Sequence, residues 1–403
     1  MKTNLTSSRK FLMAEPPHRF ISTKQTPFQR IENGILPNKT GRRVDLSSQN
    51  ITQIVLPCIL IILVFLLFYW IKLGIASWFK QKCRLPDYSN VQDNMVDLNN
   101  ISCGEVIGHG SFGTVIKGKY DELDVALKIT CFEKYKRWLN EKSILMENND
   151  DSNVIKLIDY GVKLMQNGET YLCLVLEYAD LDCLRSHLQQ NSINLQQCLH
   201  LVFTLTSAVR YIHSDRSGMG CKKLPVVHQD IKSANVLLSS VKGCILGDFG
   251  LACQLGDFPI YEKCQVGTPR YMSPEKLKGN SLDVELLLKS DIYALALVFY
   301  EILSRCYLVD SQGQLYLPGL YKTPFSDWVG SNPTIETMQE IVLVKNVRPK
   351  VKQWWRENQI LCCILNIVEK CWSTDPDQRL DASSIFRRIR NIYSQLKFEN
   401  QLC

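Results

Sequence analysis

Side chains suited to phosphoryl transfer occur in two short stretches near the middle of the chain. The sequence His-Gln-Asp-Ile-Lys-Ser-Ala-Asn ends at Asn235, and an Asp-Phe-Gly triplet begins thirteen residues later at Asp248. Transfer of a phosphoryl group from a nucleotide needs a carboxylate that orients the attacking hydroxyl, a cation beside the phosphate, and ligands for magnesium. Asp230 and Lys232 match the first two requirements. Asn235 and Asp248 could hold the metal.

A glycine-rich stretch upstream fits the pattern G-x-G-x-x-G-x-V. Glycine also marks ordinary turns, so the pattern is weak evidence by itself. The flanking residues 101–107 and 114–120 read as strands, which places the glycines in a hairpin that can cover phosphates, whereas a dinucleotide-binding loop would lead into a helix. The stretch predicted to bind nucleotide consists of Ile107, Gly108, His109, Gly110, Ser111, Phe112, Gly113, Thr114 and Val115.

A lysine follows on the next predicted strand, where Val-Ala-Leu-Lys ends at Lys128. An unpaired buried charge is costly, so we expect an acidic partner for this side chain. Glu141, on the predicted helix 132–146, is the best candidate, and Glu133 is a rival on the same stretch. The alternative is an edge lysine whose ammonium reaches solvent.

Taken in order, these motifs resemble those of eukaryotic protein kinases over about residues 98–395. The stretch 267–275 resembles the end of an activation segment, and 289–293 resembles the start of the helix that anchors the catalytic loop. Arg379 matches the arginine that pairs with the segment glutamate, here Glu275. The resemblance implies a two-lobed α+β fold.

The implied architecture is a β-rich lobe at about 98–178 and a helical lobe at about 183–395, with ATP between them. The adenine would meet backbone groups of a hinge near 176–178. Beyond the glycine-rich stretch, the resemblance implies nucleotide contacts from Ala126, Lys128, Glu177 and Tyr178.

The resemblance also implies a catalytic role for four residues and a metal-binding role for two. Lys128 would hold the α- and β-phosphates, with Glu141 fixing it. Asp230 would orient the substrate hydroxyl and accept its proton, while Lys232 would steady the transferring group. The metal ligands would be Asn235 and Asp248, holding Mg²⁺ or Mn²⁺.

Two further features of these motifs refine this expectation. Lys232 and the Gly-Thr pair at 267–268 resemble the serine/threonine kinases rather than the tyrosine kinases. Gln229 stands where most kinases carry an arginine that meets a phosphate on the activation segment. Because a neutral glutamine cannot form that ion pair, we expect activity without phosphorylation of the segment.

An apolar run without a charge extends from Ile54 to Ile71. A helix of that length spans roughly 27 Å, close to the thickness of a bilayer core. Tyr69 and Trp70 end the run, where aromatic rings prefer the membrane interface, and basic residues follow. The run predicts one transmembrane helix at 51–76 and a linker at 77–97. A buried core helix is disfavoured because the run is apolar on every face.

The chain resembles the TGF-β superfamily receptor kinases in particular. The matching segments are 138–141, the insertion 214–227, 264–268, 303–306, 347–349 and 369–372. Residues 80–103 lack the Ser-Gly-rich stretch of type I members, which favours the type II side. The resemblance implies a single-pass receptor of the plasma membrane with a cytoplasmic serine/threonine kinase that phosphorylates a type I receptor kinase.

Composition bounds the remaining parts. The chain has 403 residues, 45% of them hydrophobic, and the net charge of +7 arises mainly in residues 1–50, which hold nine basic and three acidic residues. Nucleic acid binding therefore has little support. All sixteen cysteines lie at Cys58 or later, as expected for reduced thiols on the cytosolic side.

Residues 1–50 contain no cysteine, so they cannot form the disulfide-bonded ligand-binding domain of this family. We expect a disordered, extracellular segment with glycosylation sequons at Asn4, Asn38 and Asn50, and a short tail at 396–403. A TGF-β superfamily ligand is therefore in doubt. Two explanations stay open: a truncated form, or a receptor without a ligand-binding head.

Two rival functions also stay open. The first is a kinase-like scaffold or decoy receptor that has lost catalysis, although neither the lysine nor the acids are missing. The second is a type I member shortened at its regulatory stretch.

Overall fold

The structure, a computed structural model, describes residues 96–402 except residues 111, 112, 166, 218, 219, 256–264, 280 and 311, and it describes no side chain from residue 396 onward. The predicted segment 1–50, the predicted span 51–76 and nearly all of the linker 77–97 lie outside the described residues. No helix within the described part is both long enough and apolar enough to cross a membrane. The described part is the region for which two lobes are predicted.

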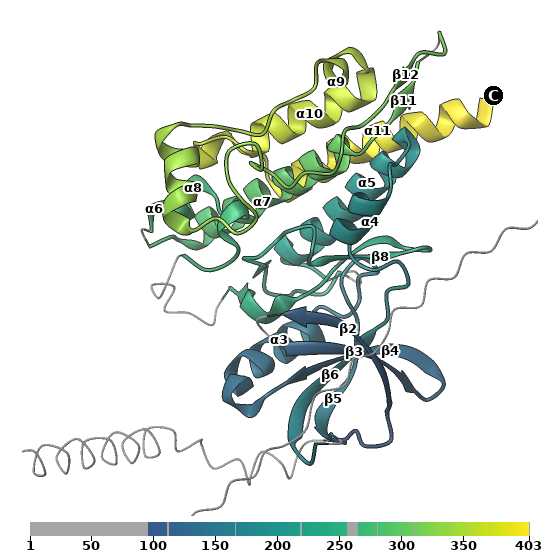
Figure 1. Ribbon diagram of the computed structural model, residues 1–403, viewed down its shortest axis with the longest axis vertical. Helices are drawn as coiled ribbons and strands as arrows, with labels where there is room; N and C mark the ends of the chain where they lie inside the picture. Colours follow the sequence, from purple (N-terminus) through teal and green to yellow (C-terminus); the bar gives the residue numbers. More distant parts are fainter. Residues whose placement is uncertain are drawn as a thin grey trace, which may run out of the picture. The chain divides into compact units, whose positions relative to one another are not determined.

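The small lobe is a six-stranded sheet that packs against one helix (Figure 1). The spatial order of its strands is β1-β5-β6-β4-β3-β2, with only the β1–β5 pair parallel. The strands are β1 (Val96–Asp97), β2 (Ser102–Gly110), β3 (Gly113–Tyr120), β4 (Leu123–Thr130), β5 (Leu157–Leu164) and β6 (Thr170–Glu177). The helix is α3 (Tyr135–Glu147), which follows the 3₁₀ turn η1 (Phe132–Lys134). The predicted hairpin over the glycines is confirmed as β2–β3.

The central strands are buried on both faces, and their side chains alternate between two environments as the period of a strand requires. Val125 and Leu127 of β4 pack with Val175 of β6 in a small cluster on one side of the sheet. Ala126, between them, belongs to the larger core that also contains Trp138 of α3. Lys128 is two residues further along, on the same face as Ala126, so β4 presents its ammonium toward α3.

The second lobe is mostly helical and is shown above the sheet in Figure 1. Its principal helices are α4 (Leu184–Gln190), α5 (Leu195–His213), α6 (Pro274–Lys278), α7 (Val284–Ser304), α8 (Ile335–Gln339), α9 (Gln353–Glu357), α10 (Gln359–Cys371) and α11 (Ala382–Leu402). The π-helical segment η4 (Glu340–Val344) continues α8, and η5 (Pro376–Gln378) precedes α11. The two-lobed α+β architecture agrees with the fold class implied by the sequence.

Helix α7 forms the centre of this lobe. Two thirds of its residues are buried, spread around its whole circumference, as expected for a helix enclosed by others. Its first turn is capped by Asp283, whose side chain accepts a hydrogen bond from the Leu286 N–H at 2.9 Å. Helix α5 begins with a capping box in which Asn194 and Gln197 exchange hydrogen bonds of 2.8 and 3.0 Å. These rigid helices support the loops that carry the polar residues.

Short strands bring those loops together. The hairpin of β8 (Val236–Ser239) and β9 (Gly243–Leu246) separates the 228–235 loop from the 248–250 loop. The Gly247 N–H donates to the Asn235 carbonyl at 2.9 Å, so the two loops leave the open end of one hairpin. A second pair joins β7 (Val226–Val227) to β10 (Cys253–Gln254). The remaining short elements are η2 (Phe249–Leu251), η3 (Pro269–Tyr271) and the hairpin of β11 (Leu308–Val309) with β12 (Leu315–Tyr316).

Candidate active site

Lys128, Glu141 and Asp248 meet where the sheet faces the helical lobe. The Lys128 Nζ lies 2.7 and 2.8 Å from the two carboxylate oxygens of Glu141 and 2.7 Å from Oδ1 of Asp248. Lys128 and Glu141 are buried, whereas the Asp248 side chain is 27% exposed. The predicted pairing of Lys128 with Glu141 is confirmed. The rival Glu133 is exposed in η1.

Helix α3 is fixed to the loop that carries Asp248. Asn140 donates its Nδ2 hydrogen to the Ala252 carbonyl at 2.9 Å, just beyond the Asp-Phe-Gly triplet. At the end of the helix, Glu147 accepts a hydrogen bond from Gln254. Phe249 is fully buried and packs edge-to-face on His228 at 4.9 Å between ring centroids. These contacts hold the helix and both loops in one arrangement.

The charges of Lys128 and Asp248 stabilise each other, whereas burial raises the pKa of Glu141. Burial alone would lower the pKa of Lys128, but the nearby charges of Glu141 and Asp248 outweigh burial and raise it. Burial would likewise raise the pKa of Asp248, but the Lys128 ammonium lowers it below its ordinary value. Lys128 is therefore a cation at neutral pH and Asp248 a carboxylate. A fixed ammonium beside a part-exposed carboxylate suits a bound phosphate and its metal.

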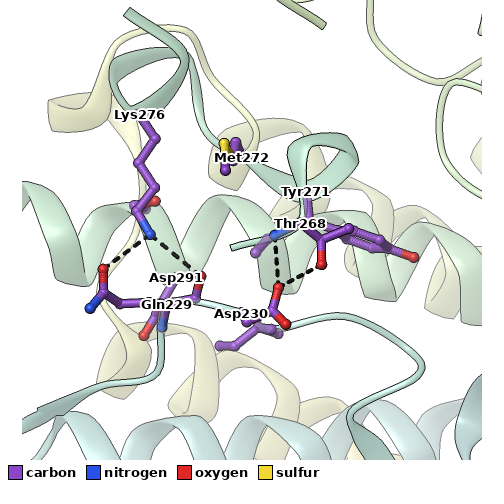
Figure 2. A pocket seen from close by; sticks show the side chains of 10 residues that line it. Gln229, Asp230, Thr268, Tyr271, Met272, Lys276 and Asp291 are labelled. Atoms are coloured by element: carbon purple, nitrogen blue, oxygen red, sulfur yellow. Dashed lines mark hydrogen bonds between the residues drawn. The ribbon is translucent and has the colours of Figure 1, made fainter. Parts of the chain in front are cut away.

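Asp230 is held by four groups around its carboxylate. Its Oδ1 accepts hydrogen bonds from the Thr268 N–H at 2.8 Å and the Thr268 hydroxyl at 2.7 Å (Figure 2). Its Oδ2 accepts from Lys232 Nζ at 2.6 Å and from Asn235 Nδ2 at 3.1 Å. Lys232 also donates to the Thr268 hydroxyl at 2.8 Å. The loop 228–235, called the catalytic loop below, and the segment 265–275, called the activation segment below, thus fix the direction of this carboxylate.

A buried carboxylate of α7 anchors the 228–235 loop through its backbone. Asp291 accepts hydrogen bonds from the His228 N–H at 2.7 Å and the Gln229 N–H at 2.9 Å. Burial opposes its ionisation, but the contact with His213 at 3.1 Å and nearby positive charge hold the pKa of Asp291 below its usual range. The anchoring role implied for the helix at 289–293 matches this geometry.

The glycine-rich hairpin is described except for Ser111 and Phe112. Gly110 pairs with Gly113 across its tip. A Cβ on Gly113 would lie 2.3 Å from the Ile129 carbonyl oxygen, so no larger residue fits there. A Cβ on Gly108 would meet only the Val115 side chain at 3.7 Å, an ordinary contact. Packing within the chain therefore requires glycine at 113 but not at 108.

Residues 176–178, which are predicted to form the hinge, lie at the end of β6 and just after it. The Glu177 N–H already donates to the Lys156 carbonyl at 3.0 Å, and the Glu177 carboxylate accepts from the Lys156 N–H at 3.0 Å and from Lys242. The ring of Tyr178 lies under the ammonium of Lys117 at 4.3 Å. The Glu177 N–H therefore already has a hydrogen-bond partner within the chain. Fewer backbone groups of the predicted hinge are then available to an adenine base.

The predicted structural pair of Arg379 and Glu275 is confirmed. The two guanidinium nitrogens lie 2.7 and 2.8 Å from the two carboxylate oxygens, a bidentate geometry. The Arg379 side chain is fully buried and also donates to the Ser373 and Lys289 carbonyls at 3.0 Å. The pair ties helix α6 to the residues before α11.

The geometry fits a metal bound through a nucleotide. Asp248 and Asn235 lie at the open end of the β8–β9 hairpin. Within the described residues no group of three or more His, Cys, Asp or Glu side chains could hold a metal ion alone. Magnesium in such sites is bound by one or two carboxylates together with substrate phosphates, so this donor set is of the expected kind.

Sequence reasoning missed two residues of the site. Thr268 entered only through sequence resemblances and no contact was predicted for it, but its hydroxyl contacts Asp230 directly. Lys276 was not noticed, although it is 2% exposed and contacts Gln229. A lysine directly after Pro-Glu at the start of a short helix is a weak signal, since most such lysines face solvent.

A family model described as protein kinase domain matches residues 101–388. The chain belongs to the protein kinase family. The match covers both lobes and every described residue of the site, from the glycine-rich hairpin to Arg379.

Curated relatives narrow the resemblance. This kinase is 32% identical to activin receptor type-2B of Xenopus laevis over 335 residues, which cover 79% of this chain and 64% of the relative. It is 29% identical to TGF-beta receptor type-2 of Mus musculus over 328 residues, covering 78% and 56%. It is 30% identical to activin receptor type-2A of Homo sapiens over 300 residues, covering 73% and 57%. The chain thus spans between half and two thirds of the length of these relatives.

Proposed function

We propose that this chain is a receptor serine/threonine kinase that transfers the γ-phosphoryl group of ATP to a serine or threonine of a type I receptor kinase. The proposal rests on one observation: the Lys128–Glu141–Asp248 triad and the Asp230–Lys232–Thr268 cluster are assembled together. Every side chain that phosphoryl transfer requires is present. The similarity to type-2 receptors supports the choice of substrate.

Each half of the site serves one part of the reaction. Lys128, fixed by Glu141, would hold the α- and β-phosphates, and the backbone at Gly108, Gly110 and Gly113 would approach them from above. Ala126 and the hinge would face the adenine. Asn235 and Asp248 would hold Mg²⁺ or Mn²⁺, which neutralises charge on the phosphates.

Asp230 would orient the attacking hydroxyl and take up its proton. Both of its oxygens are held, so the carboxylate needs no reorganisation when the hydroxyl arrives. Lys232 donates a hydrogen bond to the Asp230 carboxylate and would stay beside the transferring phosphoryl group. Preorganised groups of this kind lower the barrier because they cost no reorganisation during the reaction, and one such donor is worth about 2.7–4 kcal/mol.

A membrane location is part of the proposal. The apolar run at 51–76 would cross the plasma membrane once, with residues 1–50 outside and the kinase at 98–395 in the cytoplasm, where ATP is available. Glycosidase treatment of cell-expressed protein should shift its mobility on a gel through Asn4, Asn38 or Asn50. An unshifted band whose N-terminus resists protease added outside intact cells would refute this topology.

The activity is tested with the purified full chain, labelled ATP and Mg²⁺, and a kinase-dead type I receptor with its Ser-Gly-rich segment as substrate. We expect label on serine and threonine of that segment. Lys128→Arg and Asp248→Asn serve as matched inactive controls. Incorporation equal to the controls would leave the scaffold or decoy reading, and transfer to other substrates but not to this segment would argue against the type II assignment.

A further inference from the structure

A buried lysine lies outside the set of residues that phosphoryl transfer requires. Lys276, in α6, is 2% exposed. Its Nζ donates to the Val266 carbonyl at 3.1 Å, to the Gln229 carbonyl at 3.4 Å and to the Gln229 side-chain oxygen at 3.5 Å. Figure 2 shows the ammonium pointing down onto Gln229, beside Asp291. One cation therefore joins the activation segment to the catalytic loop.

The two segments approach each other closely at the point that Lys276 joins. Gly267 has φ +115°, and a Cβ there would lie 2.5 Å from the Gln229 carbonyl oxygen. The next residue, Thr268, makes the two hydrogen bonds that orient Asp230. Lys276 holds the carbonyls on both sides of this contact, so its position controls how Thr268 meets Asp230.

Burying the Lys276 ammonium at this joint between the two segments destabilises the folded state electrostatically. Burial lowers the pKa of Lys276, and the charge of Asp291 only partly opposes this effect. Among the described residues the hydrogen-bond partners of Lys276 are uncharged oxygens, unlike those of Lys128 or Arg379. Taking an ammonium out of water without a bonded carboxylate disfavours the charged form. A cavity of about 10 Å³ lies beside it, lined in part by Gln229 and Asp291 and just large enough for one water.

Lys163 provides a useful comparison within the same chain. It is also buried, and its ammonium binds the Leu98 and Ile101 carbonyls at 3.0 and 2.7 Å. Those carbonyls belong to one short loop that leads into the sheet, so Lys163 shapes a local turn. Lys276 joins residues 229 and 266, which lie on two separate segments of the site.

Gln229 leaves room for this arrangement. Its Nε2 donates to the Leu251 carbonyl at 3.0 Å, just after the Asp-Phe-Gly triplet, and its side-chain oxygen faces Lys276. An arginine at 229 would place a second cation there. The neutral glutamine instead hydrogen-bonds both Lys276 and the Leu251 carbonyl. It therefore connects Lys276 to the loop that carries Asp248.

We propose that Lys276 is a positioning residue that locks the activation segment onto the catalytic loop in place of a segment phosphate. The inference rests on the proposed kinase activity. Lys276 supplies from α6 the contact that Gln229 cannot make to a segment phosphate, and it needs no modification to do so. The segment therefore stands in the orientation that Thr268 and Asp230 need without being modified.

The test compares Lys276→Met with Lys278→Met in the full chain. Lys278 lies two residues away on the same helix and is exposed, so its substitution is a matched control. We expect Lys276→Met to lower kcat by about 100-fold, as a small misplacement of catalytic groups does, with KM for ATP changed by less than about twofold. Its melting temperature should not fall, because the buried cation is replaced by an apolar chain of similar length. Lys278→Met should match the wild type.

A second variant separates positioning from simple packing. Gln229→Arg should by itself reduce kcat, because the new arginine would lie beside the Lys276 ammonium and the two cations repel. In the Lys276→Met background the same substitution should restore kcat, because it returns a cation to the joint. Additive losses in the double variant, wild-type kcat in Lys276→Met, or unfolding of Lys276→Met would each overturn the inference. A wild-type protein without transfer activity would instead reject the proposed function.

Discussion

Replacing Thr268 by valine should slow the chemical step without weakening ATP binding. Valine keeps the shape of threonine and replaces the hydroxyl by a methyl group. That hydroxyl donates to Asp230 Oδ1 at 2.7 Å and accepts from Lys232 Nζ at 2.8 Å. The backbone N–H of residue 268 still donates to the same Asp230 oxygen at 2.8 Å, and Lys232 still reaches Oδ2 at 2.6 Å.

The size of the effect follows from this inventory. One of the two donors on Oδ1 is lost, and a hydrogen bond to a charged group contributes about 1.5–3 kcal/mol. Because each 1.36 kcal/mol is a factor of ten in rate, kcat should fall about 10- to 150-fold. The Lys128–Glu141–Asp248 triad is untouched. KM for ATP should therefore stay near the wild-type value.

Steady-state transfer of label from ATP to the type I receptor segment measures both constants. Thr268→Ser is the matched control, because it keeps the hydroxyl and should retain most of the wild-type kcat. Equal kcat for the valine and serine variants would refute the claim that the Thr268 hydroxyl orients Asp230. A change confined to KM for ATP would show that the Thr268 hydroxyl acts on nucleotide binding and not on Asp230.

Three further predictions follow from other parts of the structure. Phosphatase treatment of the purified kinase should leave its rate almost unchanged because Gln229 cannot pair with a segment phosphate; a large fall would reject this. Arg379→Met leaves the buried Glu275 carboxylate unpaired and should lower the free energy of unfolding by about 3–5 kcal/mol, against about 0–1 kcal/mol for Arg356→Met at an exposed pair. Burial lowers the pKa of Lys223 to about 8 from 10.5, so the unfolded chain binds more protons between those values. The stability of the wild type relative to Lys223→Met, measured by urea unfolding, should rise from pH 8 to 10.5; a flat difference would contradict the shift.

Much of the site could be predicted because its residues obey local rules. A lysine on a strand with apolar neighbours needs an acid, and Glu141 is the buried acid of the next helix. Asn235 and Asp248 come together because a single short hairpin separates them, so the distance along the chain limits their separation in space. The predicted helix at 132–146 was correct except at its start. There the first turn is 3₁₀, and Cys131 provides no side-chain cap.

The contacts of Thr268 and Lys276 could not be predicted in the same way. They depend on how closely the activation segment approaches the catalytic loop, which lies more than thirty residues earlier in the chain. No helical or strand period encodes that approach. Gly267 hints at it, because its φ and its lack of a Cβ permit the contact with Gln229, but the glycine alone does not identify the partner.

Three buried cations of this kinase should respond differently to removal, because their partners differ. Arg379 holds a buried carboxylate far from the phosphate-binding groups, so its loss should appear in the unfolding free energy. Lys128 holds one buried and one part-exposed carboxylate of the site, so its loss should affect both stability and rate. Among the described residues, Lys276 hydrogen-bonds only uncharged oxygens, so its removal leaves no unpaired carboxylate there and should affect the rate alone. The ratio of rate loss to stability loss should therefore increase from Arg379 through Lys128 to Lys276. A different order would show that the hydrogen-bond partners of a buried cation do not determine its role in this kinase.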